Sequence, residues 1–211
     1  MGLSLAAALA LAAQCAPSVA PETLLSVVQV ESRFEPLAIG VNGAPRVTVT
    51  PASAPEAVAS AERLIAAGRS VDLGLAQINS RNLGWLGLSL AEVFEPCTNL
   101  KAAARILQEG YARGEAGRVG QQAALKTALS FYNTGHPLRG LSNGYVAKVT
   151  TAAGRLVPAI ASGLPGAIPV VSPAAEPPPV AAARAWDVFG EVRSAASFFT
   201  TVAIAASGES Q

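Results

Sequence analysis

The sequence predicts a mainly α-helical domain with a small β component, followed by a segment of different composition. Up to about residue 157, apolar residues recur at helical spacing, and prolines or Ser-x-x-Glu pairs mark helix starts. One stretch, Arg46–Thr50 (RVTVT), has the alternating β-branched pattern of a short strand. From Pro158 the pattern changes, because seven of the 15 prolines lie between Pro158 and Pro179.

The first apolar stretch, Leu3–Cys15, has two interpretations. It fits a buried or amphipathic helix that belongs to the domain, and its length and small residues also fit the apolar part of an export signal. No Lys or Arg precedes it, and Pro21 follows the possible cleavage site Ser18–Ala20. These two features favour the helix.

Six further helices are predicted from apolar faces and cap residues. They are Pro21–Phe34, ended by Pro36; a helix capped by Ser53 and Glu56 and ended by Gly68; a short helix capped by Ser89 and Glu92; Asn99–Tyr111, with Asn99 as its N-cap; Gln121–Tyr132; and Tyr145–Leu156.

Three parts of the chain follow from this pattern. Residues 1–157 form the predicted domain, residues 158–183 a Pro/Ala-rich linker of extended polyproline character, and residues 184–211 a partly ordered tail. The tail contains Trp186 and Phe189, so the alternative is a docking segment for a partner protein.

Composition excludes several classes of protein. A net charge of +1 with 14% charged residues excludes a simple electrostatic nucleic-acid binder. One His and two Cys exclude a structural zinc site made by this chain alone, and we expect no metal and no cofactor. Apolar runs are too short to predict a transmembrane helix.

Glu31 is the candidate catalytic residue. It lies seven, four and three residues after Leu24, Val27 and Val28, so its carboxyl falls on the apolar face of the predicted helix. Desolvation there should raise its pKa, as a general acid requires. The alternative is a helix-terminal Glu that reaches solvent or pairs with Arg33.

Two later stretches supply neutral polar groups. Residues 74–79 (GLAQIN) and 128–135 (ALSFYNTG) contain the candidate binding residues Gln77, Asn79, Tyr132 and Asn133. Amides and hydroxyls suit an uncharged, polyhydroxylated ligand with amide substituents, such as a sugar polymer. The same sequence has simpler interpretations, since Tyr132 could pack in the core and Asn133–Gly135 could end a helix.

In this order, Glu31-Ser32, GLAQIN, ALSFYNTG and the later Tyr145 resemble the soluble lytic transglycosylase domain, which has the goose-type lysozyme fold. The resemblance covers roughly residues 13–156. The stretches VESRFEPLAIGVNG (30–43), FEPC (94–97) and NGYVAKV (143–149) are most similar to the VirB-type branch, the peptidoglycan-cleaving components of type IV secretion and conjugation systems. The tail sequence WDVFG (186–190) is similar to that branch too.

The resemblance implies a lysozyme-like fold with one cleft and assigns roles to residues. Glu31 would be the catalytic acid and base, and Cys15 and Cys97 match a cysteine pair of the branch. The implied substrate-binding roles fall to six residues: Ser32 orienting Glu31, Gln77 and Asn79 lining the cleft, Tyr132 and Asn133 positioning N-acetyl groups, and Tyr145 hydrogen-bonding near the acid.

The implied reaction cleaves the β-1,4 bond after N-acetylmuramic acid and leaves a 1,6-anhydro end. The implied location is the periplasm, with glycan strands as the substrate and secretion components as partners of the tail. Two alternatives remain open. A hydrolytic muramidase would use water and a second carboxylate, for which Glu35 or Asp72 is available, and a non-catalytic protein would bind glycan and recruit secretion components. His136, in a loop beside Pro137, is expected at the surface.

Overall fold

The computed structural model describes residues 2–43, 47–114, 117 and 120–162. Its helices are α1 (Leu5–Cys15), α2 (Pro21–Glu31), α3 (Ala54–Ala66), α4 (Leu83–Leu86), α5 (Leu90–Val93), α6 (Pro96–Arg113), α8 (Gln121–Thr134), α9 (Arg139–Ser142) and α10 (Tyr145–Ala161), with a 3-10 turn at Ser80–Asn82. Its strands are β1 (Ile39–Val41), β2 (Val47–Val49), β3 (Val71–Leu73) and β4 (Ile78–Asn79). The predicted class, mainly α with a small β part, is confirmed.

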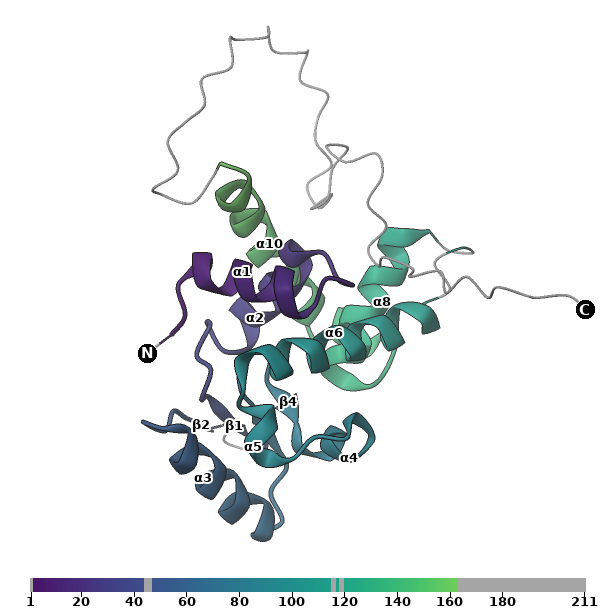
Figure 1. Cartoon of the computed structure of the whole chain (residues 1–211). Helices are drawn as coiled ribbons and strands as arrows, with labels where there is room; N and C mark the ends of the chain where they lie inside the picture. Colours follow the sequence, from purple (N-terminus) through teal and green to yellow (C-terminus); the bar gives the residue numbers. More distant parts are fainter. Residues whose placement is uncertain (1, 44–46, 115–116, 118–119, 163–211) are drawn as a thin grey trace, which may run out of the picture.

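The helices form one packed group around an apolar core (Figure 1). Helix α6 packs against α8, α10 packs against α2, and α1 contacts both α2 and α6. The apolar face expected from the sequence is buried, with Leu24, Val27 and Val28 of α2 at most 1% exposed. Burial of each such side chain contributes about 1.5–3 kcal/mol to folding.

Helix α1 belongs to this domain. Its Ala8 and Ala12 are buried in the core, and Cys15 at its end forms a disulfide with Cys97 in the first turn of α6, with the two Cα atoms 5.3 Å apart. The cysteine pair is therefore confirmed as a disulfide. It ties the end of α1 to the start of α6.

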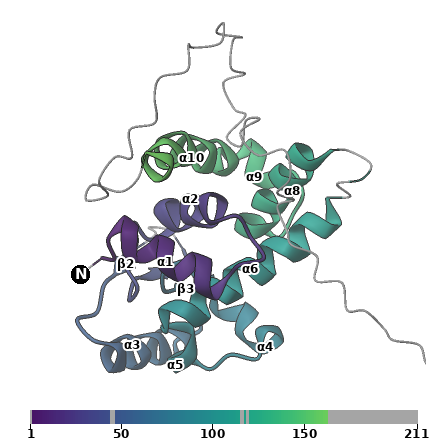
Figure 2. The same ribbon diagram turned by 45° about the horizontal axis from the view of Figure 1, so that its top comes forward.

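The strands form an antiparallel sheet in the order β2-β1-β3-β4. In both ribbon views α3 lies at one end of the molecule and α10 at the opposite end (Figure 2). Strand β1 is fully buried, whereas β2 is exposed along its length and forms one edge. The sheet thus borders the helical group on the side where α2 ends.

The cap signals of the sequence are only partly realised. Ser89 and Glu92 form a complete capping box at α5. At α3, Ser53 accepts the backbone N–H of Glu56 at 3.4 Å, but the Glu56 carboxylate accepts the N–H of Ala52 instead of that of Ser53. The first turn of α3 is therefore satisfied by a variant of the predicted box.

Four expectations need correction. The predicted helix Pro21–Phe34 ends at Glu31, because Arg33 and Phe34 adopt left-handed backbone angles (φ 55° and 67°). Helix α10 continues past Leu156 to Ala161, with Pro158 inside its last turns. Asn99 does not cap a helix, because α6 begins at Pro96.

The fourth correction concerns the sheet. Strand β2 covers 47–49 of the predicted 46–50, and β1, β3 and β4 were not predicted. Strands of two or three residues are too short to show an alternating pattern. The remainder of the predicted linker and the tail lie outside the described residues. Among the residues described, no helix is long and apolar enough to span a bilayer.

Candidate active site

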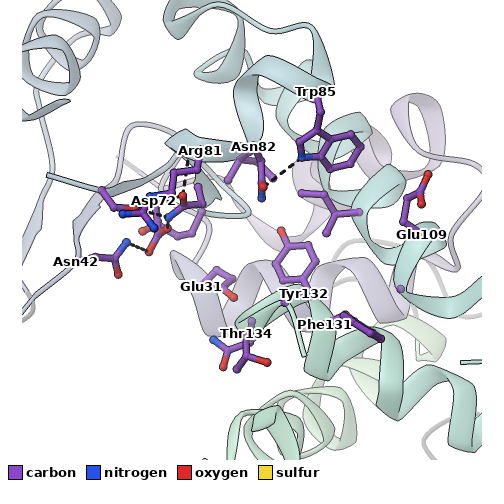
Figure 3. A pocket seen from close by; sticks show the side chains of 18 of the residues that line it. Glu31, Asn42, Asp72, Arg81, Asn82, Trp85, Glu109, Phe131, Tyr132 and Thr134 are labelled. Carbon is purple, nitrogen blue, oxygen red and sulfur yellow. Dashed lines mark hydrogen bonds between the residues drawn. The ribbon is translucent and has the colours of Figure 1, made fainter. Parts of the chain in front are cut away.

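A cleft of about 840 Å³ lies between the end of α2, the sheet, α4, α6 and α8. Figure 3 shows Asp72 and Asn42 on one side of it, Trp85 and Glu109 on the other, and Glu31 and Tyr132 between them. Five of the predicted site residues line this cleft: Glu31, Gln77, Asn79, Tyr132 and Asn133. Ser32 and Tyr145 are not among its lining residues.

Glu31 is held by a hydrogen bond from a residue 114 positions later in the sequence. The hydroxyl of Tyr145, the first residue of α10, donates a 2.6 Å hydrogen bond to Oε1 of Glu31. Burial raises the pKa of Tyr145 well above its usual value, and the nearby charge of Glu31, Tyr132 and the hydrogen bond to Glu31 raise it further. The hydroxyl therefore stays protonated and remains a donor to the carboxyl.

The chain leaves α2 directly after this carboxyl. Ser32 closes the helix, with its N–H and its hydroxyl donating to the carbonyl of Val28 at 3.0 and 3.4 Å. The hydroxyl of Ser32 is thus engaged with the helix backbone, and a role in orienting Glu31 stays a prediction. The left-handed residues that follow turn the chain away and leave the carboxyl at the helix end.

The turn between β3 and β4 supports the floor of the cleft. Gln77 has a φ of 50°, and its side-chain amide donates to the carbonyls of Ala38 and Gly74, both at 2.9 Å. The N–H₂ of Gln77 is therefore occupied in holding the turn. Gly74 has a φ of 76°, and a Cβ there would overlap the side-chain amide of Asn99.

Asn99 is the buried support of this turn. Its Oδ1 accepts the N–H of Ala76 at 2.8 Å, and its Nδ2 donates to the carbonyls of Leu73 and Val93 at 2.9 and 2.7 Å. The sequence reasoning missed this role. The signal was present, because Asn99 lies at helical spacing from the buried Ala102 and Ala103, the same kind of argument that singled out Glu31.

Asp72 faces the same cleft from β3. Its Oδ1 accepts from the amide of Asn79 at 2.7 Å and its Oδ2 accepts from the amide of Asn42 at 3.0 Å. Asn79 pairs with Asp72 across the β3–β4 ladder, and its amide also donates to Ser70 at 3.0 Å. The structure thus brings the possible second carboxylate into the cleft and holds it between two amides, whereas Glu35 is not among the lining residues.

Tyr132 lies close enough to Glu31 and Asp72 for both charges to affect its pKa. Its hydroxyl donates to the carbonyl of Ala76 at 2.7 Å. Burial raises its pKa well above the usual value, and the charges of Glu31 and Asp72 raise it further. The Tyr132 hydroxyl is therefore a protonated group near both carboxylates, and it fastens α8 to the β3–β4 turn.

Asn133 lies at the exposed end of α8. Its Oδ1 accepts from Asn143 at 2.8 Å, and the Oδ1 of Asn143 accepts the N–H of Tyr145 at 2.9 Å. Gly135, with a φ of 66°, ends the helix as the turn signal indicated. Asn143, which the sequence offered only as a turn residue, thus links Asn133 to the start of α10.

Several lining residues carried no sequence signal. Trp85, Glu109 and Arg113 line the part of the cleft formed by α4 and α6, and no spacing rule joins them to the GLAQIN or ALSFYNTG stretches. His136, expected at the surface, is partly exposed, and its backbone carbonyl accepts the Ser130 hydroxyl at 2.6 Å. Within the described ranges, no group of three His, Cys, Asp or Glu residues is placed to hold a metal ion.

With this geometry, the chain belongs to the transglycosylase SLT domain family. The family model matches residues 8–145, which include every predicted site residue. All the residues that line the cleft also lie within the matched range.

Within that family the chain is similar to VirB1 proteins. It is 46% identical to Protein virB1 of Agrobacterium fabrum over 147 residues, which is 70% of this chain and 59% of the relative. It is 44% identical to the type IV secretion system protein virB1 of Brucella abortus biovar 1 over 151 residues, 69% of this chain and 63% of the relative. The chain thus covers about 60% of the length of these curated relatives. No solved structure matches it.

Proposed function

We propose that this protein is a peptidoglycan lytic transglycosylase that opens the cell wall locally for a type IV secretion or conjugation apparatus. The observation that carries the proposal is the Glu31 carboxyl, which lies in a cleft of an SLT domain and accepts a hydrogen bond from the buried Tyr145. A carboxyl held at one position beside a large polar cleft suits proton transfer to a bound polymer.

In the first step, Glu31 in its acid form protonates the glycosidic oxygen between N-acetylmuramic acid and N-acetylglucosamine. The C1–O bond breaks, and the N-acetylglucosamine side departs with a free 4-hydroxyl. The positive charge that develops at C1 is stabilised by the substrate's own N-acetyl group, so the step needs no second carboxylate.

In the second step, the Glu31 carboxylate takes the proton of the muramic 6-hydroxyl. The oxygen of that hydroxyl attacks C1 and closes the 1,6-anhydro ring, which returns Glu31 to its acid form. No water is consumed. The Tyr145 hydrogen bond is expected to keep the carboxyl in one orientation through both steps.

The polar groups around Glu31 fit a neutral glycan. Gln77, Asn79 and Asn133 line the cleft with amide groups, and Gln77 is largely buried. We expect Asn133 to contact substrate N-acetyl groups. We expect Gln77, Asn79 and Tyr132 to act mainly by shaping the cleft, since their donors bind Ala38, Asp72 and Ala76.

A hydrolytic muramidase is the second candidate, and Asp72 is the observation that favours it. This carboxylate lies in the same cleft as Glu31 and is held in place by two amide hydrogen bonds. A carboxylate on the other side of a bound sugar could activate water.

The experiment is mass spectrometry of muropeptides released from purified sacculi by the wild type, Glu31→Gln, Asp72→Asn and Glu62→Gln. Glu62 is exposed on α3 and serves as the matched control. Release of products lighter than reducing ends by the mass of one water supports the proposal, provided that Glu31→Gln abolishes it and Glu62→Gln does not.

Three other outcomes would overturn the proposal. Reducing ends that disappear in Asp72→Asn would identify a muramidase. Anhydro products that persist in Glu31→Gln would remove Glu31 as the catalytic acid. Glycan binding by the wild type without any release of products would indicate a non-catalytic recruitment protein.

The proposal also includes a location and partners. We expect the protein in the periplasm, with secretion components as partners of residues 184–211.

A further inference from the structure

We propose that Trp85 is a stacking platform for a second sugar ring of the bound glycan, away from the bond beside Glu31. This inference rests on the proposed function, because it assumes that the cleft holds a β-1,4-linked chain of N-acetylhexosamines. Trp85 is 44% exposed, whereas most large apolar side chains of the described residues pack in the core, and it lines the cleft from α4. An exposed indole at the wall of a polar cleft is a typical ligand contact.

The ring is held in a fixed orientation before any ligand binds. Its indole N–H donates to Oδ1 of Asn82 at 3.2 Å, within the same short turn of chain. The Arg105 guanidinium lies 4.9 Å from the ring centroid, in cation–π geometry. Two independent contacts from different elements thus restrict the side chain, which lowers the entropy lost when a ligand binds.

Part of the ring is open to the cleft. Trp85 and Asn82 are lining residues, whereas Arg105 is not, and Trp85 keeps 44% of its surface exposed although Arg105 lies over the ring. The exposed part of the indole offers an aromatic surface to a pyranose ring. The apolar C–H face of a β-linked N-acetylhexosamine is the partner that this surface fits, since it needs no hydrogen-bond donor from the protein.

The platform is separate from the catalytic carboxyl. Figure 3 shows Trp85 and Glu31 apart, with the Tyr132 ring between them in that view. Glu31 comes from α2 and Trp85 from α4, on different walls of the same cleft. A chain that occupies both positions is bound through more than the two sugars joined at the cleaved bond. Trp85 should therefore affect substrate binding and have little effect on the chemical step.

The first test uses the fluorescence of Trp85. The sequence has two tryptophans, so Trp186→Phe leaves Trp85 as the only indole, and Glu31→Gln is added to prevent turnover. Chitohexaose, a β-1,4-linked N-acetylglucosamine hexamer, is the probe. We expect a saturable change in emission and reduced quenching by acrylamide. Calorimetric binding without any change in emission would overturn the inference, and so would the absence of binding.

The second test separates binding from catalysis. Trp85→Ala should raise KM on solubilised glycan strands and Kd for chitohexaose about tenfold, with kcat changed less than about twofold. Trp85→Phe keeps an aromatic face and should recover most of the affinity. Leu138→Ala, at an exposed residue outside the cleft, is the matched control and should behave as wild type.

The results distinguish this inference from the proposed function. If the wild type releases anhydro products but Trp85→Ala keeps the wild-type KM, the platform is wrong and the transglycosylase stands. If chitohexaose changes Trp85 emission but sacculi are never cleaved, the platform stands as a glycan contact and the transglycosylase proposal fails. A fall in kcat with unchanged KM for Trp85→Ala would also overturn the platform.

Discussion

The Tyr145 hydroxyl donates a 2.6 Å hydrogen bond to the Glu31 carboxyl across 114 residues of sequence. The contact exists because α10 packs along α2, so that the start of one helix lies beside the end of the other. Tyr145 is buried, and its hydroxyl is thus a fixed donor in a site that is otherwise open.

Replacing Tyr145 by Phe should remove this bond without removing the ring. We expect kcat to fall about 10- to 100-fold, since a hydrogen bond to a charged group contributes about 1.5–3 kcal/mol, while KM stays near the wild-type value. Steady-state kinetics on solubilised glycan strands measure both. A rise in KM with unchanged kcat would show that Tyr145 acts through the shape of the cleft instead.

Asn99→Ala should destabilise the domain by about 2–4 kcal/mol, because it leaves the buried Ala76 N–H and the carbonyls of Leu73 and Val93 without their partner. Urea unfolding measures the loss. Lys101→Ala, exposed on the same helix, is the control and should change stability by less than about 0.5 kcal/mol. A loss for Asn99→Ala as small as that of the control would contradict the support role of Asn99.

The Cys15–Cys97 disulfide closes a loop across 82 positions of sequence. In the chain-entropy model, such a loop contributes roughly 4–5 kcal/mol to stability. The double variant Cys15→Ser/Cys97→Ser should have a free energy of unfolding that is lower by that amount, as measured by urea unfolding. Because α1 is held to α6 by this bond, we expect amide exchange in α1 to increase most. Uniform loss of protection would mean that α1 is not a separately stabilised element.

The raised pKa values of Tyr132 and Tyr145 predict that the protein loses stability at alkaline pH. Burial and nearby carboxylates raise the pKa values of Tyr132 and Tyr145 well above the ordinary value of 10.0, so the folded state favours their neutral form. That stability is complete below pH 10 and is lost as pH rises further, by about 1.4 kcal/mol per pH unit for each tyrosine.

Unfolding free energies measured between pH 9 and 11 test this. Tyr132→Phe and Tyr145→Phe should each make the decline shallower. Tyr111→Phe is the comparison, because burial raises its pKa less, and it should have a smaller effect. Equal slopes for all four proteins would show that these hydroxyls do not control alkaline unfolding.

The local patterns of the sequence were sufficient for most helices. Pro21 begins a helix and Gly135 ends one, as their backbone preferences require. Glu31, which the apolar spacing singled out, lines the cleft, and the order of motifs indicated the family that the family model matches. The short strands were missed because two or three residues do not show an alternating pattern. The spacing of Asn99 indicates a buried side chain, but it does not show which backbone groups of another turn the amide contacts.

By itself, the sequence determined the class of fold, the helix ends set by Pro and Gly, the cysteine pair and the set of residues from which a cleft could be built. These depend on neighbours within a few positions or on motifs read in order. The tertiary structure alone decided which of those residues meet. It joined Tyr145 to Glu31, placed Asp72 between two amides and brought Trp85 to the wall of the cleft. Such contacts depend on how helices and strands pack over long sequence separations, and no local spacing encodes that arrangement.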